Sequence, residues 1–210
     1  MTKDIDLNSM NYYELEPENN SFYDIVVDIT HRCNMECKNC YVPNRFIPDM
    51  RLAEYTKFVE KLPKPVMLRI VGAEPTLHPE LTEFIRIGFE HGHNCILITN
   101  GLRLSSQPFV DKVEATGLKH VYMSLNGIDN DDWYEQIDEM RCATKKIKAF
   151  INCKDKFNMN AGIILVKGIN EEAPRAAFDL ITREKVPDIT LRFKNVGQLG
   201  RYQKDADENL

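Results

Sequence analysis

Short apolar runs alternate with longer amphipathic stretches along most of this 210-residue chain, and this alternation constrains the fold more than any other feature. The runs are rich in Val, Ile and Leu, as parallel strands buried on both faces are, and they lie at residues 24–29, 66–71, 95–99, 119–125, 160–166 and 189–194. The stretches between them repeat apolar residues every three or four positions, which predicts helices with one buried face, at residues 49–62, 79–91, 108–116, 131–153 and 171–184. The fourth stretch is long enough for two helices.

The order strand, helix, strand predicts a parallel sheet with right-handed crossovers. Six such units are too few for the eight-stranded barrel, so we predict an α/β fold, a partial (β/α)6 TIM-like barrel. We expect one domain over residues 1–210, with an N-terminal arm at 1–22 and a flexible tail at 203–210. Ligands of such folds bind beyond the carboxyl ends of the strands.

Polar, glycine-bearing segments follow the predicted strands, which places them at one edge of the sheet. Turn formation alone can account for such segments, but their shared position favours one common site. The segments are Gly72-Ala73-Glu74-Pro75, Thr99-Asn100-Gly101, Ser124-Leu125-Asn126-Gly127 and Lys167-Gly168-Ile169-Asn170, with Arg192 and Lys194 on the last strand.

Three cysteines within eight residues follow the first strand, with the spacing C-x3-C-x2-C at Cys33, Cys37 and Cys40. A four-iron cube takes four ligands, normally thiolates, so three thiolates leave one iron open to a molecule that is not protein. The same cysteines are also compatible with structural zinc, given a fourth ligand such as His31 or Cys95. The spacing alone leaves both metals open.

The net charge and the hydropathy of the chain argue against nucleic-acid binding and against membrane insertion. The net charge of −5 does not suggest a broad basic surface for nucleic acid. The chain contains no apolar run long enough to span a bilayer and no secretory signal in residues 1–20, so we expect a cytoplasmic protein without a membrane partner. Thiols stay reduced in that compartment, so we expect Cys95 to be a packed core thiol. Lys145, Lys146 and Lys148 are interpreted as a solvated helix face.

The chain resembles the radical S-adenosylmethionine (radical SAM) superfamily over about residues 24–201. The resemblance rests on two motifs in this order, the cysteine loop and then Val71-Gly72-Ala73-Glu74-Pro75. The segments after the third and fourth strands and Gly197-Gln198-Leu199-Gly200-Arg201 are similar to further motifs of that superfamily. The resemblance implies a [4Fe–4S] cluster on the three cysteines and S-adenosylmethionine as the second cofactor. It also implies reductive cleavage to a 5′-deoxyadenosyl radical, which removes a hydrogen atom from a substrate.

The resemblance also implies roles for individual residues at the cofactor. Backbone groups of Gly72 and Ala73 are expected at the methionyl end of S-adenosylmethionine, and Glu74 near its ammonium. The expected contacts to the ribose or the carboxylate come from Ser124 and Asn126.

Two positions depart from the superfamily pattern. Asn39 stands where an aromatic residue usually precedes the last cysteine, so Tyr41 is expected to pack near the adenine instead. Backbone of the fifth strand, near Leu165 and Val166, is expected on the adenine as well. Ala73 replaces a glycine, and because alanine tolerates positive φ poorly, the turn is expected to keep negative φ there.

The sequence constrains the substrate less than it constrains the cofactors. A bare partial barrel suggests a peptide or nucleotide-type substrate first, and a small molecule is equally compatible with the motifs. The resemblance implies an electron donor such as flavodoxin or ferredoxin. The alternatives are an activase of glycyl-radical enzymes and a zinc-stabilised binding module without turnover.

Overall fold

The computed structural model describes residues 23–42, 45–62, 65–186 and 188–195. The expected arm at 1–22, the tail at 203–210 and the motif at 197–201 lie outside the described residues. None of the described helices is long and apolar enough to cross a membrane.

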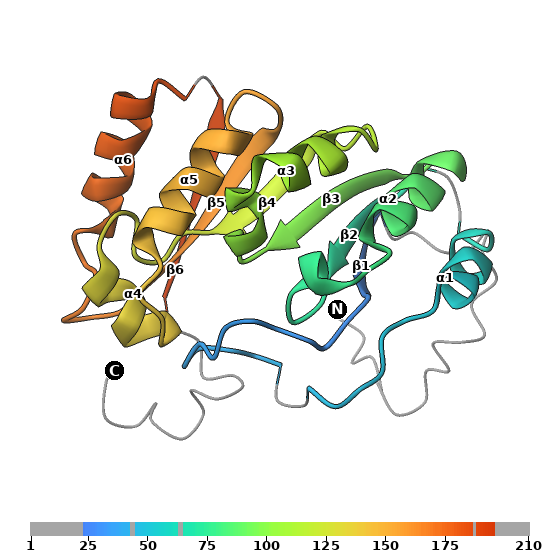
Figure 1. The fold of residues 1–210 in the computed structure, drawn as a ribbon, viewed down its shortest axis with the longest axis horizontal. Helices are drawn as coiled ribbons and strands as arrows, with labels where there is room; N and C mark the ends of the chain where they lie inside the picture. The colour runs from blue at the N-terminus through green and yellow to red at the C-terminus, as the bar shows by residue number, and fades with distance from the viewer. Residues whose placement is uncertain (1–22, 43–44, 63–64, 187, 196–210) are drawn as a thin grey trace, which may run out of the picture.

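A single sheet of six parallel strands forms the centre of the described structure, and the strands follow one another in chain order (Figure 1). Each strand lies within two residues of its predicted apolar run, which confirms the α/β fold and the partial barrel. The strands are β1 (Asp24–Asp28), β2 (Met67–Val71), β3 (Asn94–Thr99), β4 (His120–Ser124), β5 (Asn158–Leu165) and β6 (Ile189–Asn195).

The helices lie on one side of the curved sheet, and the other side carries none of the described helices (Figure 1). The predicted stretch 131–153 contains two helices, since the first ends at Glu139, whose φ of 53° interrupts the helix. The α-helices are α1 (Leu52–Val59), α2 (Leu81–Glu90), α3 (Gln107–Glu114), α4 (Asp131–Asp138), α5 (Ala143–Cys153) and α6 (Ala173–Glu184).

The hydrophobic core lies between the sheet and this helical layer. Alternate strand residues point to opposite faces of a sheet, so one set, with Leu68 and Leu97, packs under the helices against Phe84 and Phe150. Cys95 belongs to this core with 1% of its surface exposed, as expected. The other set of strand residues faces the side on which none of the described helices lies.

Candidate active site

The three predicted cluster cysteines surround one cavity of about 320 Å³ at the carboxyl ends of the strands. They reach it from the long connection between β1 and α1, and they lie there without converging on a site for a single ion among the described residues. A cube offers a separate iron corner to each thiolate, so its ligands are spread more widely than those of one ion. Of the residues expected to contact S-adenosylmethionine, five line the same cavity, namely Tyr41, Gly72, Ala73, Ser124 and Asn126.

The cysteine loop is held by packing and by backbone hydrogen bonds. Met35 is 2% exposed and packs in a small cluster with Leu102 and Tyr134. The Lys38 N–H donates to the Ile137 carbonyl at 3.1 Å, which ties the loop to α4. A loop of this length would otherwise be mobile, so these contacts keep the thiols at the cavity.

Burial changes the acidity of the thiols. It raises the pKa of Cys33 and of Cys37, and at Cys37 the neighbouring Asp138 carboxylate raises the pKa further. A metal cluster requires thiolates, so its binding must displace these protons.

An arginine in the cavity wall fits an anionic cluster. One terminal nitrogen of Arg45, Nη2, lies 3.7 Å from Cys40 Sγ. The other, Nη1, donates to the Met35 carbonyl at 2.7 Å and forms an ion pair with the exposed Glu36 at 3.0 Å. The Nε atom of Arg45 is buried and has no hydrogen-bond partner in the described part of the chain. Thiolates and sulfides carry negative charge, and a guanidinium with a free donor stabilises such a group. The donor set of three thiols with this cation therefore suits an iron–sulfur cube.

The Gly-Ala-Glu-Pro turn after β2 is bound directly to the start of the cysteine loop. The Ala73 N–H donates to the Thr30 carbonyl at 2.8 Å, and the Glu74 N–H donates to the Arg32 carbonyl at 2.9 Å. Gly72 permits this approach, because a Cβ there would lie 2.3 Å from the Thr30 oxygen. Ala73 is not among the described residues with positive φ, as expected.

Glu74 occupies a different environment from the one expected. Its side chain is fully buried, does not line the cavity, and accepts hydrogen bonds from Thr76 N, Thr76 Oγ1, Thr99 Oγ1 and Asn100 N at 2.5–3.0 Å. The side chain is thus more deeply buried than expected, and its contact with a ligand ammonium stays a prediction. Since both oxygens already have donors, Glu74 acts as an internal bridge between the turn after β2 and the exit of β3.

Asn126 is also held by the protein. Its Nδ2 donates to Asp138 Oδ1 at 2.9 Å, and its Oδ1 accepts from the Ile164 N–H at 3.0 Å. The amide thus joins β4 to β5 and to α4 beneath the cavity. Sequence reasoning missed Asp138, which is 1% exposed and lines the cavity. Its place at the end of an amphipathic helix gives no local signal of this role.

Lys146 corrects another expectation. The sequence predicts a solvated face for this residue, but its side chain is fully buried and its ammonium donates to the Asn100 carbonyl, the Ser124 carbonyl and Ser124 Oγ. The interpretation failed because α5 turns this position toward the ends of β3 and β4. Lys145 and Lys148 are exposed, as expected.

The fifth strand lines the cavity with residues just before the predicted position. Leu165 packs against the helix-side core and does not line the cavity, whereas Gly162, Ile163 and Ile164 do. The Leu165 side chain lies on the strand face opposite to that of Ile164. The expected contact concerns the backbone of this segment and stays a prediction.

The chain is similar in sequence to a described superfamily and to several characterised enzymes. The family model of the radical SAM superfamily matches residues 27–181. Fe-coproporphyrin III synthase of Methanosarcina barkeri is 29% identical over 196 residues, which cover 89% of this chain and 47% of that protein. GTP 3′,8-cyclase of Aquifex aeolicus is 27% identical over 193 residues, covering 86% of this chain and 56% of that protein. The chain thus spans about half the length of these relatives.

Solved structures share the fold. The Streptococcus suis protein SuiB, solved with its precursor peptide SuiA, superposes with a TM-score of 0.69 at 17% identity, over 87% of this chain and 41% of that one. Methylornithine synthase (PylB) superposes with a TM-score of 0.62 at 14% identity, over 84% of this chain and 54% of that one.

Proposed function

The chain belongs to the radical SAM superfamily, and on that premise we propose that its cavity holds a [4Fe–4S] cluster and S-adenosylmethionine and uses them to start a radical reaction. The observation that carries this proposal is the shared cavity, which joins three thiols in C-x3-C-x2-C spacing to the exits of the neighbouring strands. When bound, these cofactors supply a 5′-deoxyadenosyl radical that removes a hydrogen atom from the substrate.

The chain's own residues bind and shield the cofactors. Cys33, Cys37 and Cys40 would ligate three irons, and Arg45 would lie against the cluster as a counter-charge. Backbone of Gly72 and Ala73 would meet the methionyl group.

The adenosine end would lie farther along the cavity. Ser124 would face the ribose or the carboxylate, while Tyr41, which is 64% exposed, has room to move onto the adenine. The backbone of 162–164 would form the remaining wall. Such a site positions a reactive group and excludes water, which is the protein's share of cofactor chemistry.

The substrate proposed here is a peptide or a nucleotide-type molecule. The names of the similar proteins support both classes, because one is a GTP cyclase and another was solved with a precursor peptide. A small one-electron carrier such as flavodoxin or ferredoxin would deliver the electron.

Anaerobic reconstitution tests the proposal. We expect about four irons and four sulfides per chain, and 5′-deoxyadenosine on addition of dithionite and S-adenosylmethionine. Cys37→Ala is expected to abolish the brown absorbance, since two thiolates do not retain the cube. The control Cys153→Ala removes a core thiol outside the cavity and is expected to keep it. Colourless protein with tetrahedral zinc would contradict the proposal.

A further inference from the structure

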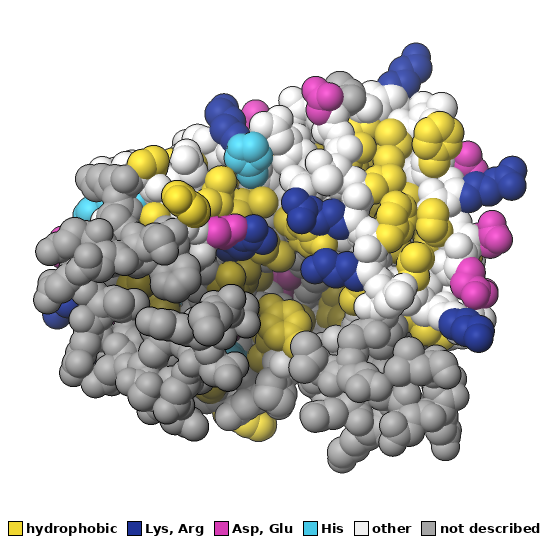
Figure 2. All heavy atoms as spheres, turned by 180° about the vertical axis from the view of Figure 1, so that it is seen from behind, with side chains coloured by type: hydrophobic (Ala, Val, Ile, Leu, Met, Phe, Trp, Pro, Cys, Tyr) yellow, Lys and Arg dark blue, Asp and Glu magenta, His cyan; other side chains and the backbone are white. Residues whose placement is uncertain are grey.

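Two cations lie side by side on the face of the sheet that the helices leave open. Arg192 and Lys194 are two residues apart on β6, so both side chains emerge on one face. Their partners in the register with β5 are Gly162 and Ile164, which line the cavity. Figure 2 shows this side of the molecule, where basic side chains gather beside apolar ones around a hollow.

Neither cation is neutralised within the described part of the chain. No ion pair or side-chain hydrogen bond joins Arg192 or Lys194 to another described residue, and both are exposed. Arg69 on the same face differs from these two residues, because it forms a bidentate ion pair with Asp24 at the opposite edge of the sheet. The open face therefore carries a neutralised arginine at one edge and two available cations at the other.

A tyrosine hydroxyl lies over β5, next to the strand that carries these cations. A Cβ at Gly162 would come within 2.0 Å of the Tyr122 hydroxyl, so the glycine gives the phenol its place over β5. Burial raises the pKa of Tyr122 and the charge of Arg192 opposes that rise, which indicates that the two groups are close. At neutral pH the phenol keeps its proton and can donate it to an acceptor.

Lys194 and Tyr122 line the cavity that contains the thiols. Arg192 is not among the lining residues, but it lies beside Gly162, which is. Asp138, a carboxylate in the same wall, is already held by Asn126. A guanidinium, an ammonium and a hydroxyl group are all donors to anionic oxygens, so together they favour binding of a phosphate or a carboxylate.

We propose that Arg192, Lys194 and Tyr122 bind an anionic group of the substrate, a phosphate or a carboxylate, and so place the rest of that substrate in the cavity beside the cluster. This inference rests on the proposed function, because it takes the thiol cavity to be the reaction site. It narrows the substrate to molecules that carry such a group.

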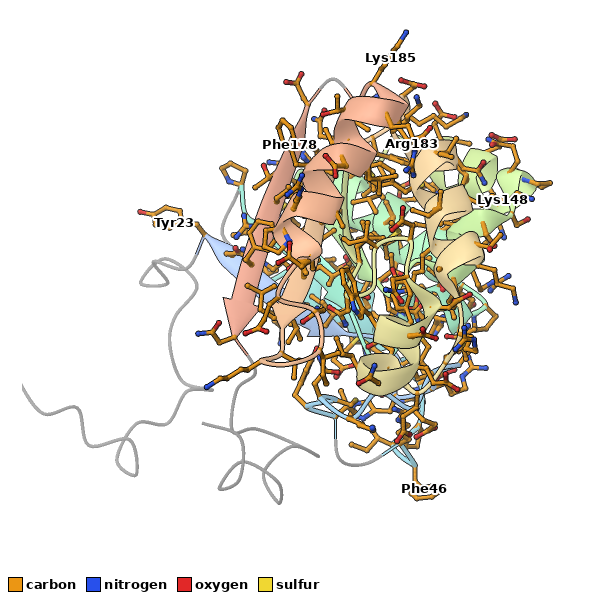
Figure 3. All side chains as sticks on the ribbon, turned by 90° about the vertical axis from the view of Figure 1, so that its left-hand side faces the viewer. Tyr23, Phe46, Lys148, Phe178, Arg183 and Lys185 are labelled. Carbon is orange, nitrogen blue, oxygen red and sulfur yellow. The ribbon has the colours of Figure 1, made fainter. Side chains whose placement is uncertain are left out.

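The test is calorimetric binding to the reconstituted protein with S-adenosylmethionine present. The probes are inorganic tripolyphosphate for the phosphate source and a tri-glutamate peptide for the carboxylate source. We expect at least one probe to bind, and the double variant Arg192→Gln/Lys194→Gln to weaken it about tenfold or more. The matched control, Lys148→Gln/Lys185→Gln, removes the same charge from lysines that point away from the molecule (Figure 3), and it should change binding less than about twofold.

The outcomes separate this inference from the proposed function. Equal weakening by both double variants, or no binding of either probe to the unmodified protein, would overturn the anion site. Weaker binding of S-adenosylmethionine itself to Arg192→Gln/Lys194→Gln would assign the cations to the methionyl carboxylate and also overturn it. Absence of 5′-deoxyadenosine from the unmodified protein, by contrast, contradicts the proposed function and leaves the measured anion binding as it stands.

Discussion

The ammonium of Lys146 donates a 2.5 Å hydrogen bond to the backbone carbonyl of Asn100, which joins helix α5 to the exit of β3. The same ammonium reaches the Ser124 carbonyl at 3.1 Å, so one buried cation holds two neighbouring strand ends. Asn100 in turn donates from Nδ2 to Asn34 Oδ1 at 2.8 Å, next to Cys33. The lysine thus supports the cysteine loop without facing the cavity.

Lys146→Met is expected to destabilise the protein by about 3 kcal/mol, because the carbonyls of Asn100 and Ser124 lose a charged donor inside the protein. Urea unfolding measures the change in free energy. The neighbouring Lys145→Met is the control, and since that side chain is exposed, its cost should stay within about 0.5 kcal/mol. Equal costs for the two variants would contradict the bridging role.

Glu74→Gln should also be costly. The amide replaces one accepting oxygen by a donor, so at least one of the N–H and O–H groups of Thr76, Thr99 and Asn100 loses its partner, at about 1–3 kcal/mol. Thermal unfolding compares it with Glu60→Gln, an exposed position at the end of α1. Loss of S-adenosylmethionine affinity in Glu74→Gln at unchanged stability would argue for a direct contact and against the bridge.

Gly72→Ala is expected to disrupt the turn after β2. Its Cβ would meet the Thr30 backbone oxygen at 2.3 Å, and a backbone atom cannot move aside as a side chain can. Gly117→Ala is a suitable comparison, since that position has space around it and a φ of 87°, and should cost only the left-handed strain of about 1–2 kcal/mol. Iron content after reconstitution and urea unfolding should both show the larger loss for Gly72→Ala.

Thiol labelling should separate the cysteines into two groups. Cys95, Cys142 and Cys153 are buried, whereas the three cavity cysteines are partly exposed. Burial raises the pKa of Cys95 and of Cys153 to about 12 and that of Cys142 to about 11, and it raises the pKa of Cys37 as well. Access of the reagent, and not acidity, therefore separates the two groups. N-ethylmaleimide is therefore expected to modify only the cavity cysteines of the metal-free folded protein, and none after reconstitution. Mass spectrometry of the intact chain counts the adducts, and unfolding in guanidinium restores six sites. Labelling of Cys153 in the folded protein would contradict this division.

The sequence by itself determined the positions of the strands and helices and the cysteine motif. Strand and helix positions follow from periods of two and of 3.6 residues, and the cysteine spacing predicts three metal ligands, because both signals lie within a few consecutive residues. The glycine-bearing strand exits gave the edge of the sheet where a site should lie.

Only the tertiary structure decided which polar groups are consumed inside the protein and which face the cavity. In the sequence, Glu74, Asn126 and Lys146 are polar residues near strand ends or on a helix, yet each has a partner 12–46 positions away. Burial makes each partner obligatory, since an unpaired charge or amide is costly there. Whether a polar side chain binds another part of the protein or a ligand therefore depends on which strand ends meet in the fold. The order of residues in the sequence does not contain that information.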